Sequence, residues 1–351
     1  YTLDRLLSCK AMQRQNLIAI IAGLIGSLAW GLAFGQSGSE SSGSLDAQVE
    51  LGLPPVEPPP REFATAEAHY RYLYAAAEGG TAHTMSTIPV WDGLWTSGNN
   101  TMPGLFIEDG TLMHAISPGG EVNRGVLTPP YEQHFIDRRA EMSEYGEQRY
   151  DRLTNCEYPG VPRWLWEPYV KEFVNTPKQT WMMNDLMNET RRVYIGAEHV
   201  NIDAKHSATG DSIGFWDDDK LVIWTKWVNP ADYLRGLPLT SNQFEMVETW
   251  QQTSNDDGSR RLVTQVTFYD PLALVAPLSA VYTHDSRPDL EEIGVRIRNW
   301  ECTTSSNSYK DAEGNTQFYL PGDPEYKDPR GFTDFPELPG QSLDPIFDAA
   351  Q

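Results

Sequence analysis

Basic residues are scarce in this chain, where 27 Lys and Arg stand against 49 Asp and Glu and give a formal net charge of -22 over 351 residues. Proteins that bind nucleic acid neutralise its phosphates with clustered Lys and Arg. The composition therefore excludes nucleic acid as an expected partner, and it disfavours an anionic membrane surface for the same reason. We expect a small molecule as the partner instead.

Cysteine is also sparse, with three residues in the whole chain. Three cysteines exclude a disulfide-rich scaffold and a four-cysteine zinc site. The sequence also lacks a phosphate-binding loop, a dinucleotide fingerprint, a serine-hydrolase elbow and an H-E-x-x-H zinc motif. It therefore predicts no metal and no cofactor, and it leaves open whether the protein is an enzyme.

The seven histidines are dispersed along the chain. His199 and His206 lie near Asp203 and Asp211, and these residue types are metal ligands in many proteins. Their spacing, however, matches no established metal motif. We interpret them as solvated loop residues.

One long apolar segment is present, at residues 17–35, and it follows Lys10 and Arg14. A basic start, an apolar core and then small residues are typical of a secretory signal peptide, here cleaved before Gln36. Residues 1–35 would then be upstream residues and the signal. The alternative is an uncleaved membrane anchor, because about 20 apolar residues span a bilayer. We expect an exported protein, periplasmic or extracellular, with anchoring in the inner membrane as the alternative.

The composition divides the rest of the chain into three parts. Residues 36–62 are rich in Ser and Gly and then in Pro, which is typical of a linker that is flexible first and stiff afterwards. Residues 63–303 form a single β-rich domain, and residues 304–351 form an irregular tail rich in Pro and Asp. Capping residues, Pro and Gly predict helices near 65–77 and 129–145.

The strands of the domain are joined by short connections, which favour an antiparallel meander. A hairpin is expected around Asp109-Gly110, with strands at 105–107 and 112–115. The strands predicted after it are 180–187, 192–195, 212–216, 221–227, 243–251, 261–269, 280–284 and 293–302.

Several of these strands carry apolar or aromatic residues on both faces. Because side chains alternate along a strand, one face can line a closed barrel while the other packs under the helices and the tail. A meander of about eight such strands can close around one small ligand. The sequence therefore predicts a mainly β fold with a lipocalin-like barrel, short N-terminal helices and an irregular C-terminal tail.

Glu248 is a carboxylate on an otherwise apolar and aromatic strand face. If it is buried it needs a partner, which Arg296 or Arg298 could supply. One interpretation of Glu248 is a ligand anchor or an acid/base group with a shifted pKa. The alternative is a structural ion pair, or a rim position that is open to water. The many tryptophans indicate either a well-filled core or a pocket for an apolar or aromatic ligand. The predicted ligand-binding residues are Trp216, Trp224, Phe244, Glu248, Trp250, Arg296 and Trp300.

Cys156 and Cys302 both belong to the part of the chain that would be exported. In an oxidising compartment they are candidates for a disulfide that closes a very long loop. The alternative is two buried free thiols.

Residues 88–303 contain a series of short motifs in a distinctive order. It comprises Cys156 to Arg163, Arg192-Val193-Tyr194 followed by His199, Gly210 to Thr225, Glu248, Asp270-Pro271 and Glu301-Cys302. The order resembles a large family of secreted bacterial proteins that has no established activity. The resemblance implies export and a β-rich, barrel-like body. It also indicates Arg192, His199, Trp216, Glu248 and Asp270 as positions to test.

The chain departs from that family pattern at two places. Gly196-Ala197-Glu198 stands before His199 where the family has Asp-Gly-Arg, and Asp218 stands where the family has Gly. These departures weaken an active role for His199. The Asp270-Pro271 pair is also explained as a turn that ends its strand, which we favour over a catalytic role.

Three hypotheses of function follow. The first is an exported binding protein that holds a small apolar or aromatic ligand in a Trp-lined barrel cavity. The second is an exported acid/base enzyme, such as a hydrolase, hydratase or isomerase, that uses Glu248, Asp270 or His199 as its catalytic residue. The third is an accessory subunit of an envelope complex, anchored in the membrane by an uncleaved helix at residues 17–35.

Overall fold

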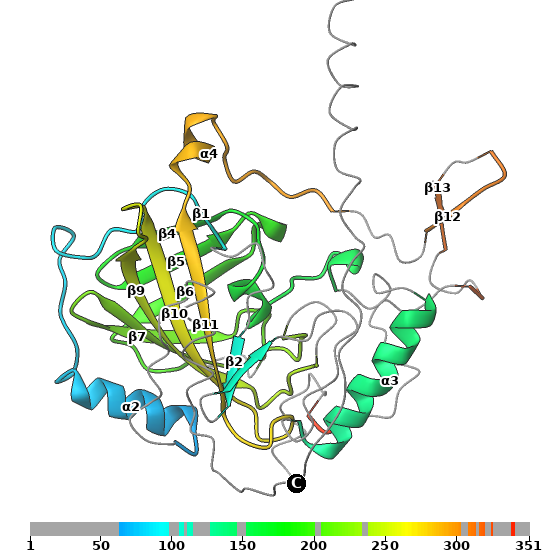
Figure 1. Ribbon diagram of the computed structural model, residues 1–351, viewed down its shortest axis with the longest axis horizontal. Coiled ribbons are helices and arrows are strands. Elements are labelled where there is room, and N and C mark those ends of the chain that lie inside the picture. The colour runs from blue at the N-terminus through cyan, green and yellow to red at the C-terminus, as the bar shows by residue number, and fades with distance from the viewer. Residues whose placement is uncertain are drawn as a thin grey trace, which may run out of the picture. The chain divides into compact units, whose positions relative to one another are not determined.

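The fold was analysed in a computed structural model (Figure 1). It describes residues 63–97, 105–108, 111–114, 127–145, 152–200, 205–233, 238–302, 308–313, 316–319, 324–325 and 338–340. The predicted signal peptide and linker lie outside the described residues. No helix in the described part is both long and apolar enough to cross a membrane.

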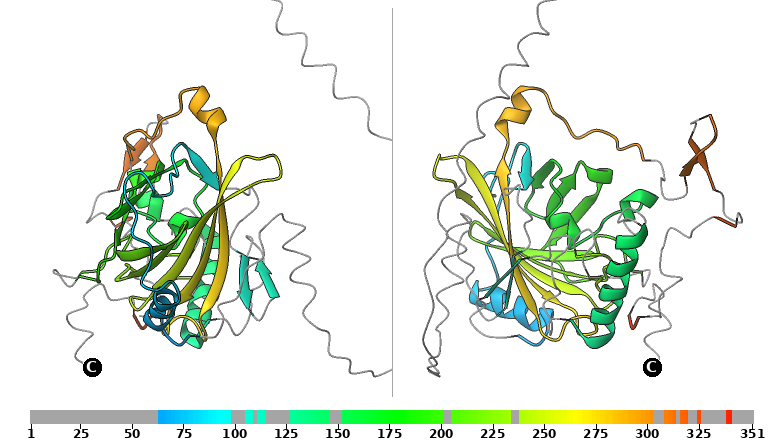
Figure 2. Two further views of the ribbon diagram at one scale, coloured as in Figure 1. Left: turned by 90° about the vertical axis from the view of Figure 1, so that its left-hand side faces the viewer. Right: turned by 45° about the vertical axis from the view of Figure 1, so that its right-hand side comes forward.

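A closed barrel of nine strands forms the body of the described structure (Figures 1 and 2). The hydrogen-bonded order runs from β1 to β4 and on to β11, and β1 pairs with β11 to complete the ring. The predicted mainly β, lipocalin-like fold is thereby confirmed. The barrel strands are β1 (Trp95–Ser97), β4 (Lys171–Asn175), β5 (Gln179–Asn184), β6 (Thr190–Ile195), β7 (Asp211–Asp217), β8 (Lys220–Lys226), β9 (Glu245–Ser254), β10 (Arg260–Tyr269) and β11 (Leu278–Ser286).

Strands β5 to β11 coincide with the first seven strands predicted from residue 180 onward. The eighth, at 293–302, is wrong. Helix α4 (Pro288–Glu292), with Pro in its first turn, ends just before this segment, and residues 293–302 form turn and irregular chain. Asp185 and Asn188 bind the backbone of residues 298 and 300, so side chains replace a strand ladder there.

The barrel is completed by β1 and β4, which the sequence did not reveal. They are short, at three and five residues, and β4 begins with two charged residues, Lys171 and Glu172. β1 meets β4 at a single pair, Trp95 with Lys171, and it meets β11 over three pairs. This part of the ring therefore has few backbone hydrogen bonds.

One pair of neighbours breaks the antiparallel pattern. β6 and β7 run parallel and pair over three residues, from Val193 with Ser212 to Ile195 with Gly214. Residues 196–210 connect them, a length sufficient for the crossover that parallel pairing requires. The other neighbouring pairs of described strands are antiparallel, including the predicted hairpin of β2 (Leu105–Glu108) and β3 (Thr111–His114), which extends the sheet from β11.

Helix α2 (Ala66–Ala76) covers the outer face of β8, β9 and β10. Thr65 caps it, because its hydroxyl accepts from the N–H of Ala68 at 3.2 Å. Helix α3 (Pro129–Tyr145) contributes Tyr131 and Phe135 to the core that continues into the barrel. The described 3-10 helices are Arg152–Asn155, Arg163–Leu165 and Leu186–Asn188.

The two faces of the strands form two separate cores, as their alternation predicts. Inside the barrel, residues such as Trp216, Ile223 and Trp250 belong to one cluster. On the outside, Phe215 and Trp224 belong to a second cluster that packs against α2. Single strands therefore supply both cores.

Past residue 302 the described segments include a small hairpin, β12 (Ser308–Lys310) with β13 (Thr316–Phe318), where the sequence predicted irregular chain. Cys156 and Cys302 are joined by a disulfide with a Cα–Cα distance of 5.7 Å. It ties the first described 3-10 helix to the chain that follows α4.

Reduction of this disulfide is expected to destabilise the fold. The bridge spans 146 residues, and a closed loop of that length restricts the unfolded chain strongly. We expect a loss of about 2–4 kcal/mol of unfolding free energy on reduction, measured by urea unfolding. Cys302→Ser should show the same loss and no further response to reductant. A reductant-sensitive Cys302→Ser variant would contradict this assignment.

Candidate functional site

Glu248 lies inside the barrel with an exposed fraction of 0%. Both of its oxygens bind the Arg191 guanidinium, with Arg191 Nη1 donating to Oε1 at 3.0 Å. The Trp250 indole N–H also donates to Oε1, at 3.1 Å. The predicted partners Arg296 and Arg298 are wrong, because that segment is not a strand beside β9.

In addition to its ion pair, Arg191 binds hydroxyl groups on two other strands. Its Nε donates to Ser212 Oγ at 3.1 Å, and its Nη2 donates to Thr225 Oγ1 at 2.6 Å. The charges of Arg191 and Glu248 are therefore compensated within the protein. This geometry favours a structural ion pair over an acid/base group at Glu248.

The interior aromatic residues pack tightly around this pair. Trp216, Phe244 and Trp250 have exposed fractions of 1%, 0% and 0%. Trp250 stacks on His284 with ring centroids 5.4 Å apart, and Trp216 packs against Trp91 at 5.3 Å. Phe244 also lines a pocket on the outside of the barrel, whereas Trp216 and Trp250 do not. The three residues therefore do not line that pocket together, and Trp216 and Trp250 belong to the packed interior.

Three other predicted ligand residues lie outside the barrel interior. Trp224 points from the opposite face of β8 toward α2, with its ring 5.6 Å from that of Tyr70. Arg296 is exposed, and its Nη1 donates to a neighbouring backbone oxygen. Trp300 packs edge-on against Tyr169 at 5.8 Å. The structure thus separates them from Trp216 and Trp250.

Asp270 is 2% exposed and stabilises the turn after β10. It accepts from the Ser241 hydroxyl at 2.5 Å, from the Ser241 N–H at 2.7 Å and from the Ala273 N–H at 3.2 Å. Burial raises the pKa of Asp270, although these donors oppose the shift. Its contacts fit a turn residue. Arg192, which the family resemblance also indicated, lies over the Trp181 ring at 4.2 Å on the outside of the barrel.

A second group of buried ionisable residues includes Lys171, at the start of β4, and Glu189, just before β6. Burial lowers the pKa of Lys171 to about 7, and its ammonium donates to the Glu167 carbonyl oxygen. Burial raises the pKa of Glu189 to about 8, and the Gly160 N–H donates to Glu189 Oε1 at 2.9 Å. Glu189 Oε2 is buried with no hydrogen-bond partner in the described structure. Burial therefore disfavours the charged form of both groups.

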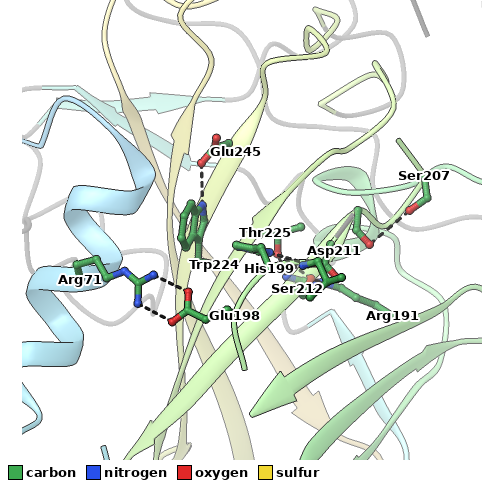
Figure 3. Close-up of polar contacts among 12 residues, drawn as sticks. Arg71, Arg191, Glu198, His199, Ser207, Asp211, Ser212, Trp224, Thr225 and Glu245 are labelled. Carbon is green, nitrogen blue, oxygen red and sulfur yellow. Dashed lines mark hydrogen bonds and ion pairs between the residues drawn. The ribbon is translucent and has the colours of Figure 1, made fainter. Parts of the chain in front are cut away.

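His199 is not a solvated loop residue, since its side chain is 5% exposed. Its Nδ1 donates to Asp211 Oδ2 at 2.6 Å, and its Nε2 has no partner among the described residues (Figure 3). The ring meets Trp224 edge to face at 4.4 Å and Trp227 at 5.6 Å. The described residues hold no cluster of three metal-ligating side chains. The His199–Asp211 pair has the arrangement of an acid/base dyad, but the Trp224 and Trp227 indoles pack against the imidazole.

A pocket of about 660 Å³ opens beside α2, on the outside of the barrel. We call it the outer pocket. Its volume falls within the range of small-molecule sites, and its wall combines apolar, aromatic and polar groups. Its described lining comes from residues 64–66, 206, 226–227, 242–245, 269–271 and 274–277.

Trp227 and Lys226 form one wall of the outer pocket, at the end of β8. The Lys226 ammonium lies 4.3 Å from the Trp227 ring centroid and 5.1 Å from that of Trp224. Trp227 has φ of 56°, a left-handed conformation that is rare for a bulky residue and is found at functional sites. Trp227 follows the last residue of β8 and lines the pocket in this conformation.

His206 and Glu245 also line the outer pocket. His206 Nε2 donates to the Asn242 carbonyl at 3.0 Å, which leaves the buried Nδ1 without a partner in the described structure. Glu245 accepts from the Trp224 indole N–H at 2.7 Å (Figure 3), and burial raises its pKa. The described lining of the pocket therefore includes one ammonium, the Trp227 indole and the His206 imidazole with its unpartnered Nδ1.

Sequence reasoning missed Arg191, His206, Lys226, Trp227 and Glu245 as site residues. One signal for Arg191 was present, because alternation from Val193 places residue 191 on the interior face of the same strand. The pocket residues gave no such signal, since their segments meet only in the folded chain.

Comparison with known proteins adds no further constraint. No family model, no curated protein and no solved structure matches the chain.

Glu248→Gln is expected to destabilise the protein, because it leaves the Arg191 charge buried and unpaired. We expect a loss of about 3–5 kcal/mol of unfolding free energy in urea. Glu292→Gln, at an exposed residue on α4, should change it by less than about 0.5 kcal/mol. The double variant Arg191→Met/Glu248→Gln should cost less than the sum of its single changes. Strict additivity, or an unchanged Glu248→Gln variant, would contradict a buried ion pair.

Glu189→Gln is expected to change how stability depends on pH. The folded-state pKa is about 8 against an ordinary 4.5, so the folded protein keeps a proton that the unfolded chain releases. This group therefore lowers stability as pH rises from 4.5 to 8, by up to roughly 1.4 kcal/mol per pH unit. The variant removes that term, so its Tm relative to wild type should rise across this window. A Tm difference that stays constant from pH 5 to pH 8 would exclude a protonated, buried Glu189.

Proposed function

We propose that this protein is an exported binding protein, periplasmic or extracellular, for a small apolar or aromatic ligand. The ligand is placed in the outer pocket rather than in the barrel interior. The observation that carries this proposal is a pocket of about 660 Å³ walled by a conformationally strained Trp227. The packing around Glu248 favours the same choice, because Trp216 and Trp250 are 1% and 0% exposed.

Export is part of the proposal and has two supports. The disulfide between Cys156 and Cys302 is typical of proteins in oxidising compartments. The apolar segment at residues 17–35 has the pattern of a signal peptide. The resemblance to secreted bacterial proteins agrees with both. A membrane-anchored subunit would depend on that same segment remaining uncleaved.

An exported acid/base enzyme is the second candidate, and the His199–Asp211 pair favours it. The Asp211 carboxylate orients the imidazole in the way that a general base requires. Against it, Nε2 is buried against Trp224 and Trp227, with no nucleophile hydrogen-bonded to it in the described structure. Of the three residues first considered for catalysis, His199 keeps the best geometry.

The outer pocket can be tested with 1-anilinonaphthalene-8-sulfonate, a fluorescent aromatic probe. We expect one saturable site on the wild-type protein and about tenfold weaker binding to Trp227→Asn. Asn tolerates the left-handed backbone at this position, so the change removes the indole without adding strain.

The matched control lies inside the barrel. Trp216→Phe should leave the probe affinity within twofold of wild type, because this ring is 1% exposed. Both variants must keep cooperative unfolding, since partly folded states also bind this probe. Loss of binding in Trp216→Phe with retention in Trp227→Asn would place the ligand in the interior and overturn the proposal.

A further inference from the structure

Lys226 lies on the wall of the outer pocket and forms no direct ion pair with a described carboxylate. Its ammonium contacts the Trp224 and Trp227 rings, and no described carboxylate lies within 4.0 Å of it. Elsewhere in the described structure Arg71, Arg261 and Arg287 each bind a carboxylate directly.

Carboxylates are available on the strand beside Lys226 and at its own pocket wall, yet both are engaged elsewhere. Asp211 stands opposite Lys226 in the β7–β8 ladder, but its carboxylate accepts from His199 at 2.6 Å. Glu245, at the start of β9, accepts from the Trp224 indole N–H at 2.7 Å. Ring N–H groups thus bind both acids (Figure 3), and neither acid contacts the Lys226 ammonium directly.

The two indoles hold the ammonium in place without consuming its hydrogen-bond donors. A cation over an aromatic face is stabilised by the ring quadrupole, and its N–H groups stay available for other acceptors. Lys226 therefore presents a positioned positive charge beside the apolar wall of the pocket. Burial raises the pKa of the nearby Glu245, while the Trp224 hydrogen bond and the Lys226 charge oppose that shift.

We propose that the outer pocket binds an organic acid, whose carboxylate pairs with the Lys226 ammonium and whose apolar or aromatic body packs against Trp227. This inference rests on the proposed function and specifies its ligand class. A charge-assisted pair is roughly twice as strong as a neutral hydrogen bond, so charge should dominate selectivity at this position.

Two probes of nearly equal shape test the proposal, indole-3-acetate and its neutral amide indole-3-acetamide. Titration calorimetry at pH 7 should show the acid binding at least about tenfold more tightly than the amide, as expected for a hydrogen bond to a charged group. Lys226→Met should weaken acid binding by about tenfold and amide binding by less than twofold. Met keeps the length of the side chain and removes only its charge and donors.

Lys220→Met is the matched control, because Lys220 begins the same strand at its other end. It should leave both affinities unchanged, and both variants should unfold cooperatively at the wild-type Tm. Equal affinity for acid and amide, or equal loss of both in Lys226→Met, would overturn the acid proposal and leave a binding pocket in place. If neither compound binds, the acid proposal fails, and if the naphthalene probe also fails to bind, the proposed function fails with it.

Discussion

The buried pairing of Arg191 with Glu248 is the interaction on which the barrel most depends. β6 and β7 run parallel over only three residue pairs, so this seam has little backbone bonding of its own. Arg191 lies on β6 and reaches Ser212 on β7, Thr225 on β8 and Glu248 on β9. Its guanidinium therefore joins four consecutive strands. The same planar group that neutralises Glu248 supplies the cross-links that the short parallel ladder lacks.

The sequence predicted much of this fold because alternating side chains carry the information. Residues such as Trp216 and Phe215 alternate between an interior core and a helix-covered face, and that pattern predicts a barrel with an outer layer. β1 and β4 could not be found this way, because they are too short to alternate visibly. Apolar and polar side chains also alternate along residues 293–302, yet this segment pairs with no strand in the described structure. Side-chain alternation indicates that a segment is extended, but it does not indicate which strand pairs with that segment.

The functional site was harder to predict for a related reason. Glu248 stood out because a carboxylate interrupts an apolar face, and the structure explains it as a compensated charge inside a packed core. The outer pocket combines the start of α2 with segments around residues 206, 226, 243 and 270, which are distant in sequence. No local pattern marks such a meeting. The hydrogen bonds that engage Asp211 and Glu245, and leave Lys226 without a direct ion pair, are likewise visible only in the folded chain.

The central claim is that the ligand binds on the outside of the barrel and not within it. A crystal structure of the protein with indole-3-acetate tests this most directly. The account predicts density for the indole against Trp227, with the carboxylate at hydrogen-bond distance from the Lys226 ammonium. Density inside the barrel, beside Trp250 and displacing the rings that surround Glu248, would contradict it.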